Sequence, residues 1–124
     1  MFVSRLAAGA ALALAFTTSA AAQPVTLTIA VSSFNFAPKP IHLAAGKPIT
    51  LTFVNHSGGG HDFTAKRFFA SSRILSGAAP NGEIELAGNQ TRSITLVPAA
   101  GTYDAHCSHF LHKQMGMQDL IVVD

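Results

Sequence analysis

One cysteine, two histidines and one methionine stand in an order and spacing that metal binding would explain. Four residues separate Cys107 from His112, and four more separate His112 from Met117. His61 comes much earlier in the chain, directly after three glycines. A thiolate with two imidazoles and a weak thioether is the ligand set of mononuclear copper sites that exchange one electron. We therefore predict one copper ion bound by His61, Cys107, His112 and Met117.

Each of these residue types suits an ion that alternates between Cu(I) and Cu(II). A thiolate is a strong, soft donor, imidazoles bind both oxidation states, and a distant thioether adjusts the potential. The chain has a single cysteine, Cys107, so an intramolecular disulfide is impossible. A centre with two copper ions and two bridging cysteines is excluded for the same reason.

Two neighbouring residues compete for places in this ligand set. Met115 lies close to Met117, but Met117 follows a glycine and begins an apolar segment, so we favour Met117. His109 offers an alternative imidazole. Only one residue separates it from Cys107, which is tight for both to bind one copper ion in this arrangement.

The other histidines are predicted to lie outside the site. We expect His42 and His56 at the surface. His106 directly precedes Cys107 in an extended segment, and successive side chains of a strand point to opposite faces. The side chain of His106 should therefore point away from the metal and toward solvent.

Short segments of alternating apolar and polar residues must position these side chains. Gly, Pro and Asn clusters separate them at intervals typical of turns between strands. The pattern predicts an all-β protein, a Greek-key β-sandwich of seven to eight strands. The predicted strands cover residues 25–31, 41–43, 48–55, 61–65, 82–86, 91–97, 102–107 and 117–123.

Two stretches between these strands are harder to interpret. Residues 32–40, with two prolines and two phenylalanines, are predicted to be a loop. Residues 66–80 fit a short helix or an irregular crossover, and their large apolar residues could face the core. These residues are Phe68, Phe69, Ile74 and Leu75.

The first 22 residues have the features of a secretory signal peptide. Arg5 is followed by an apolar run of about 11 residues, too short to span a bilayer, and Ala20–Ala22 fits a cleavage site. We predict a mature domain over residues 23–124. Without Arg5, 7 of the 8 Lys and Arg residues remain against 6 Asp and Glu, and they are scattered, so nucleic-acid binding is not indicated. No later segment is long and apolar enough to predict a membrane span.

Two segments resemble the cupredoxin family of azurin- and plastocyanin-type proteins. The run from Tyr103 through Cys107, His112 and Gly116-Met117 to the apolar residues 120–123 is similar to the family's C-terminal copper loop. Residues 53–55, leading to 61–63, resemble the segment that carries the family's first histidine ligand. The resemblance implies a cupredoxin-like β-sandwich, equatorial binding by His61, Cys107 and His112, and axial binding by Met117. It also implies that Asn55 ties the two ligand-bearing loops together.

These features predict an exported electron carrier that is not an enzyme. We expect a periplasmic monomer that passes single electrons between transient redox partner proteins, which would dock near His112 and the apolar Phe110 and Leu111. A copper carrier for assembly or resistance is the alternative. His106 and His109 motivate it as additional donors. A structural domain with another metal, such as Zn(II), is a third possibility.

Overall fold

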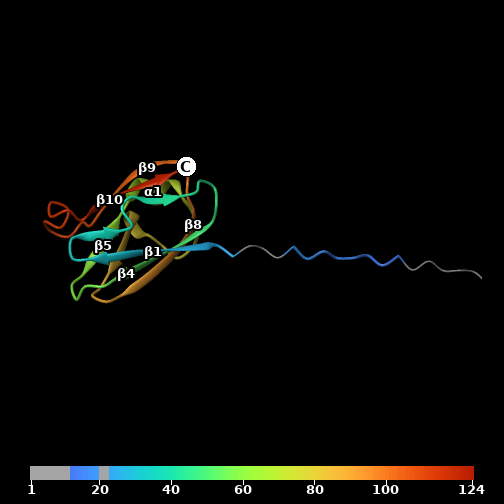
Figure 1. Ribbon diagram of the computed structural model, residues 1–124, viewed down its shortest axis with the longest axis horizontal. Helices are drawn as coiled ribbons and strands as arrows, with labels where there is room; N and C mark the ends of the chain where they lie inside the picture. Colours follow the sequence, from blue (N-terminus) through green and yellow to red (C-terminus); the bar gives the residue numbers. More distant parts are fainter. Residues whose placement is uncertain (1–11, 20–22) are drawn as a thin grey trace, which may run out of the picture.

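The computed structural model describes residues 12–19 and 23–124, and residues 25–123 form a sandwich of two five-stranded sheets (Figure 1). One short α-helix and one 3₁₀ turn interrupt the strands. The elements are β1 (Val25–Ser32), β2 (Asn35–Ala37), β3 (Ile41–Leu43), β4 (Ile49–Asn55), β5 (His61–Thr64), α1 (Lys66–Ser71), β6 (Arg73–Ser76), η1 (Pro80–Gly82), β7 (Glu83–Leu86), β8 (Thr91–Val97), β9 (Gly101–His106) and β10 (Gln118–Val123).

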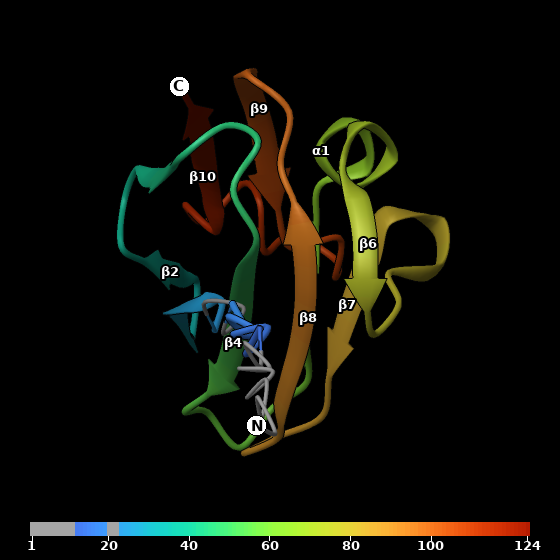
Figure 2. The ribbon, with the colours of Figure 1, turned by 90° about the vertical axis from the view of Figure 1, so that its right-hand side faces the viewer.

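Successive strands of the chain pass several times from one sheet to the other. The first sheet has the order β2-β1-β4-β8-β6, and the second has the order β3-β10-β9-β5-β7. β1 pairs in parallel with β4, β3 pairs in parallel with β10, and the other pairs are antiparallel. Figure 2 shows β4, β8 and β6 side by side, with α1 next to β6. The predicted all-β sandwich is confirmed.

The described residues contain ten strands, whereas the sequence predicted seven or eight. The additional strands, β2 and β6, are three and four residues long and form the two edges of the first sheet. Every residue of β6 is exposed, so the strand has no buried face to produce an alternating pattern. The expectation that Ile74 and Leu75 face the core is wrong, since they are 39% and 46% exposed.

The core lies between the sheets and is filled by alternate residues of each strand. In β4, Leu51 and Phe53 point inward, as the alternation predicted. Phe53 lies 4.8 Å from Phe63 of β5 between ring centroids, and Phe36 of β2 meets Phe63 edge-on at 5.2 Å. Phe68 from α1 is also buried, as expected. These aromatic contacts join the two sheets directly behind the segment that begins at His61.

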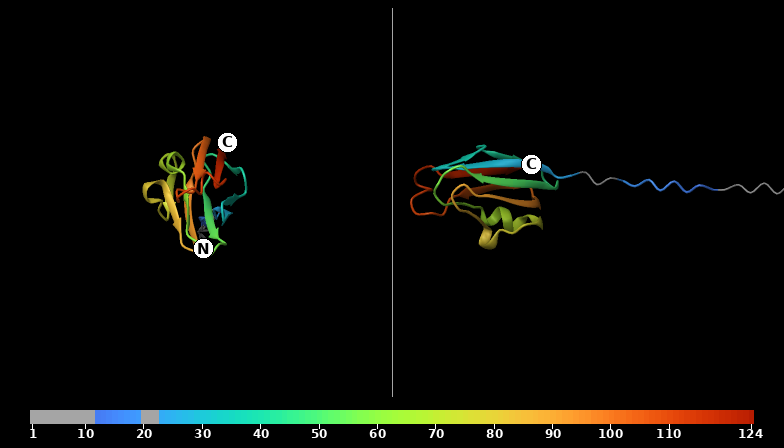
Figure 3. Two further views of the ribbon diagram at one scale, coloured as in Figure 1. Left: turned by 90° about the vertical axis from the view of Figure 1, so that its left-hand side faces the viewer. Right: turned by 90° about the horizontal axis from the view of Figure 1, so that it is seen from below.

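The loop between β9 and β10 lies at one end of the sandwich, opposite the end at which β1 begins (Figures 1 and 3). β5 is antiparallel to β9, so it begins, at His61, at the same end as this loop. Within residues 12–19 and 23–124, no helix has the length and apolar character needed to cross a bilayer. Arg5 and the predicted cleavage site at Ala20–Ala22 lie outside the described residues.

Candidate metal centre

Three of the four predicted ligands meet at the loop end of the sandwich. Donor atoms of His61, Cys107 and His112 all lie within 4.8 Å of one another. His61 Nδ1 is 3.1 Å from His112 Nδ1, and Cys107 Sγ is 3.4 Å from the same His112 nitrogen. Two ligands bound to one first-row ion at about 2.0–2.3 Å are typically about 3–4 Å apart. The three side chains thus have the spacing of a shared metal ion.

Strand ends place these donors. His61 is the first residue of β5, and all four residues of that strand are buried. Cys107 follows β9, and its backbone N–H donates to the carbonyl of Met117, just before β10, at 3.1 Å. The Met117 N–H in turn donates to the His112 carbonyl at 3.0 Å. The loop is closed at its base by these bonds, which hold three predicted ligands on one short stretch of backbone.

The two methionines that compete for the fourth ligand position differ in their burial. Met117 has no exposed surface, whereas Met115 is 58% exposed. Gly116 between them has a φ of 95°, in the left-handed region that favours glycine. This turn directs the chain from the exposed loop into β10, so Met117 enters the interior beside Cys107 and Met115 remains outside.

Asp62 ties the two ligand-bearing segments together, a role the sequence analysis did not assign to it. Its Oδ1 accepts the backbone N–H of Ser108 at 2.8 Å and the hydroxyl of Thr64 at 2.8 Å, and its Oδ2 accepts the Ser108 hydroxyl. The Asp62 N–H points to Cys107 Sγ at 3.5 Å. The position of Asp62, between His61 and a buried phenylalanine, was the only signal of this role in the sequence.

The expected role of Asn55 therefore needs correction. Its side chain donates to the carbonyls of Gly59 and Ala87 and accepts from the N–H and hydroxyl of Ser57. These bonds hold the loop before His61 against the turn that follows β7. A Cβ at Gly88, in that turn, would lie 2.2 Å from the Gly58 carbonyl oxygen, so only glycine allows this approach. The side chain of Asn55 therefore orders only the loop that leads to His61, and it does not bond to the loop that carries His112.

Aromatic contacts orient the imidazole of His112. Phe34, in the turn between β1 and β2, meets the ring edge-on at 5.1 Å. The rings of His61 and His112 lie 4.9 Å apart. The sequence predicted only a loop at Phe34, because the partner of its side chain is distant in the chain.

The surroundings of His61 and Cys107 favour the uncharged form of each side chain before a metal ion binds. Burial lowers the pKa of His61, and the nearby imidazoles of His112 and His109 lower it further. The neutral form, which binds metals, therefore predominates at neutral pH. Burial raises the pKa of the Cys107 thiol, so a metal ion must displace its proton on binding.

Comparison with known proteins identifies the family of this fold. A family model described as a cupredoxin-like domain matches residues 4–123. The chain belongs to the cupredoxin-like family. No curated protein matches the sequence.

Solved structures share this cupredoxin-like fold at low sequence identity. A reduced auracyanin from Roseiflexus castenholzii is 21% identical, with a TM-score of 0.63, and the match covers 83% of this chain and 99% of that one. Auracyanin A, described as a "blue" copper protein from Chloroflexus aurantiacus, is 23% identical, with a TM-score of 0.61 and coverages of 82% and 100%. A laccase from Pediococcus acidilactici is 17% identical, with a TM-score of 0.63. That match covers 86% of this cupredoxin-like chain but only 28% of the laccase.

The other histidines of the cupredoxin-like domain lie where the sequence predicted. His42 and His56 are exposed, and the half-buried His106 continues the outward-facing positions of β9. His109, which the sequence offered as an alternative imidazole, lies against the site. Its ring stacks on that of His61 at 6.2 Å, and its Nε2 is 2.9 Å from Glu85 Oε1.

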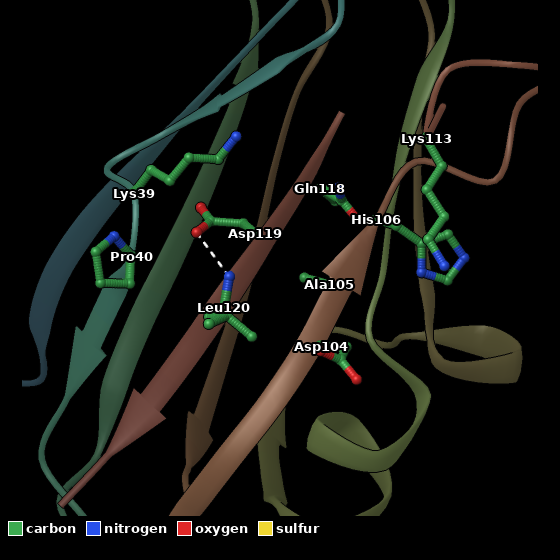
Figure 4. Close-up of a pocket in the computed structure, with 9 residues that line it drawn as sticks. All are labelled: Lys39, Pro40, Asp104, Ala105, His106, Lys113, Gln118, Asp119 and Leu120. Atoms are coloured by element: carbon green, nitrogen blue, oxygen red, sulfur yellow. Dashed lines mark hydrogen bonds between the residues drawn. The ribbon is translucent and has the colours of Figure 1, made fainter. Parts of the chain in front are cut away.

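A groove with a volume of about 610 Å³ lies elsewhere, along β9 and β10 (Figure 4). Lys39 and Pro40 flank one side of the groove, and His106 and Lys113 lie at the other. Asp119 is buried here, and burial raises the pKa of its carboxyl group. Its Oδ1 accepts the Leu120 N–H at 2.7 Å, whereas Oδ2 has no hydrogen-bond partner among the described residues. None of the predicted metal ligands lines this groove.

Proposed function

We propose that this chain is an exported copper protein that carries single electrons. One copper ion is bound by Nδ1 of His61 and of His112, by Sγ of Cys107 and by the thioether of Met117. The convergence of the first three donors within 4.8 Å supports this proposal most directly. One sulfur and two nitrogens are a soft and borderline donor set, which suits copper in both oxidation states.

Bound copper would supply one reversible electron, and the protein residues would keep its surroundings constant. His61 is fixed at the start of a buried strand, and Cys107 and Met117 are joined through their backbones. Burial of Cys107 and Met117 excludes water from the sulfur side of the site. A rigid, dry set of ligands limits rearrangement when the oxidation state changes, which favours electron transfer without turnover of a substrate.

Exposed apolar residues around His112 provide a surface for redox partners. Phe110, Leu111 and Met115 are 88%, 49% and 58% exposed, and all lie in the same loop as His112. Large apolar side chains grouped at a surface mark interaction sites. A small, transient interface with redox proteins, formed by a monomer, fits this loop. The signal peptide predicted over residues 1–22 would place the mature protein in the periplasm.

The absorption spectrum of the mature protein with added Cu(II) tests the proposal. We expect one copper per chain, an intense thiolate-to-Cu(II) band, and reversible loss of that band on reduction. Cys107→Ser should abolish the band, whereas His56→Ala, an exposed histidine, should leave it unchanged. A band of full intensity in Cys107→Ser would contradict the proposed ligands.

The position of His109 favours a copper carrier as the second candidate function. Its side chain is 32% exposed and lies beside the buried donors, where it could pass copper to or from solvent. A carrier is expected to form a colourless copper complex that gives up Cu(I) readily to a chelator. A coloured complex that cycles reversibly and retains its copper would favour the electron carrier.

A further inference from the structure

Cys107 belongs to two groups of candidate metal ligands. One group is the proposed copper site with His61 and His112. In the other, donor atoms of Asp62, Cys107 and His109 also lie within 4.8 Å of one another. The two groups share the sulfur and lie side by side, since the His109 ring is 6.2 Å from that of His61 and 5.4 Å from that of His112. A metal ion bound to Cys107 therefore has two alternative sets of partners.

The carboxylate of Asp62 retains the capacity to bind an ion. Oδ1 already accepts two hydrogen bonds, from the Ser108 N–H and the Thr64 hydroxyl. Oδ2 accepts only the Ser108 hydroxyl, so one of its two lone pairs is unused. His109 Nε2 is 3.7 Å from this oxygen, too far for a hydrogen bond. This distance is close to the spacing of about 3.4 Å expected between two donor atoms bound to one tetrahedral ion.

A fourth donor is available on the solvent side. Glu85 Oε1 lies 2.9 Å from His109 Nε2, in a hydrogen bond that a bound ion would replace, and the Glu85 side chain is 53% exposed. Donor oxygens of Glu85 and Asp62 also lie within 4.8 Å of each other. The second group thus combines two carboxylates, one imidazole and the shared thiolate. Oxygen and nitrogen donors suit a hydrated divalent ion better than the sulfur-rich copper set does.

We propose that Asp62, Glu85, Cys107 and His109 form a second, entrance position for a divalent first-row ion, Cu(II) or Zn(II). This inference rests on the proposed copper site, to which the ion moves. Cu(II) binds first at the more exposed His109, and the Cys107 thiol releases its proton to solvent. His61 and His112 then replace the carboxylates and His109, while the sulfur stays bound and copper remains Cu(II).

Co(II) binding to the double variant His61→Ala/His112→Ala tests the second position alone. We expect one Co(II) per chain with a thiolate-to-Co(II) charge-transfer band. Adding His109→Ala should weaken binding at least tenfold. Adding His106→Ala, which removes a histidine next to Cys107 on the opposite face, should not. A missing band, or equal affinities for the two triple variants, would overturn the second position, provided that circular dichroism shows the sandwich intact.

Loading kinetics on the otherwise unchanged chain provide a test if the double variant does not fold. Stopped-flow mixing with Cu(II) follows the growth of the thiolate band. His109→Ala should slow this growth at least tenfold, and His106→Ala should match the original chain. Equal rates for all three proteins would overturn the entrance role. If the original chain forms no thiolate band at all, the proposed copper function itself fails, so the two failures are distinguishable.

Discussion

The strand that carries His61 and the loop that carries His112 are held in different ways. All four residues of β5 are buried, and the strand pairs with β7 on one side and with β9 on the other. The loop over residues 108–116 is mostly exposed and is joined to the sandwich mainly at its base. The strand fixes where the site lies, whereas the loop closes the site and presents a surface. Sequence changes in the loop should therefore alter binding and recognition with little effect on folding.

Removing an aromatic side chain from each region should give the largest contrast. Phe53→Ala leaves a cavity beside Phe63, behind the His61 strand, and should lower the free energy of unfolding by about 3–5 kcal/mol. Phe110→Ala in the loop, where the ring is 88% exposed, should change it by less than about 0.5 kcal/mol. Urea unfolding of both variants measures the difference. Similar losses would show that the loop is part of the cooperative core.

Asp62 joins the two regions, so its loss should be costly. Asp62→Ala leaves the Ser108 N–H and two hydroxyls without their acceptor, and should lower the free energy of unfolding by about 2–4 kcal/mol. Asp62→Asn keeps one acceptor oxygen and should cost less. Glu85→Ala, on an exposed carboxylate of the adjoining β7, is the control. An Asp62→Ala variant as stable as the original chain would mean that the tie does not hold the loop in place.

The two methionines provide a more selective comparison. Met117→Leu keeps the buried volume but removes the proposed axial donor. Because an added donor favours Cu(II), its loss should raise the reduction potential, by roughly 1–2 kcal/mol or about 40–90 mV. Met115→Leu, in the exposed loop, should leave the potential unchanged. Voltammetry of the copper-loaded variants measures both. A shift caused by Met115→Leu alone would assign the axial position to Met115.

The smallest expected effect lies at Asp119 in β10, in the groove along β9 and β10. Burial raises the pKa of this carboxyl group, so the folded state favours the protonated form. Stability should therefore fall as the pH rises from below about 3.9, the unfolded value, through the raised value in the folded state. Asp119→Asn should be more stable at pH 7 by about 1 kcal/mol and should lose this pH dependence. Urea midpoints at pH 3 and pH 7 test this, with the exposed Asp104→Asn as the control.

Most of the successful predictions depend on two local features of the sequence: the alternation of apolar and polar residues in strands, and the spacing of the candidate ligands. Nine of the ten described strands have buried residues, and in strands such as β4, where Leu51 and Phe53 point inward, burial repeats every second residue. The strands β2 and β6 form by pairing with an existing edge, and neither has an alternating pattern that predicts a strand. β2 has three residues, of which only Phe36 is buried, and every residue of β6 is exposed. The proposed ligands Cys107, His112 and Met117 lie within 11 residues of one another, and their relation is visible in the chain.

Contacts between distant segments could not be predicted in the same way. The sequence suggested that Asn55 joins the ligand loops, but the structure assigns this to Asp62, whose acceptor oxygens face Ser108. Both are polar residues close to His61, and only the pairing of β5 with β9 shows which one reaches the C-terminal loop. Phe34 meets His112 for a similar reason, since the turn after β1 lies at the same end of the sandwich.

The sequence by itself determined the fold class, the family and the four residues proposed to bind copper. Each of these can be predicted from the local alternation of apolar and polar residues or from the order and spacing of the candidate ligands. Only the tertiary structure decided that His61 meets the C-terminal loop at 3.1 Å, that Met117 is buried while Met115 is not, and that His109 faces two carboxylates. These relations depend on how two sheets pack and on which strand ends share one edge. Side chains far apart in the chain acquire a common environment only when the core brings those ends together.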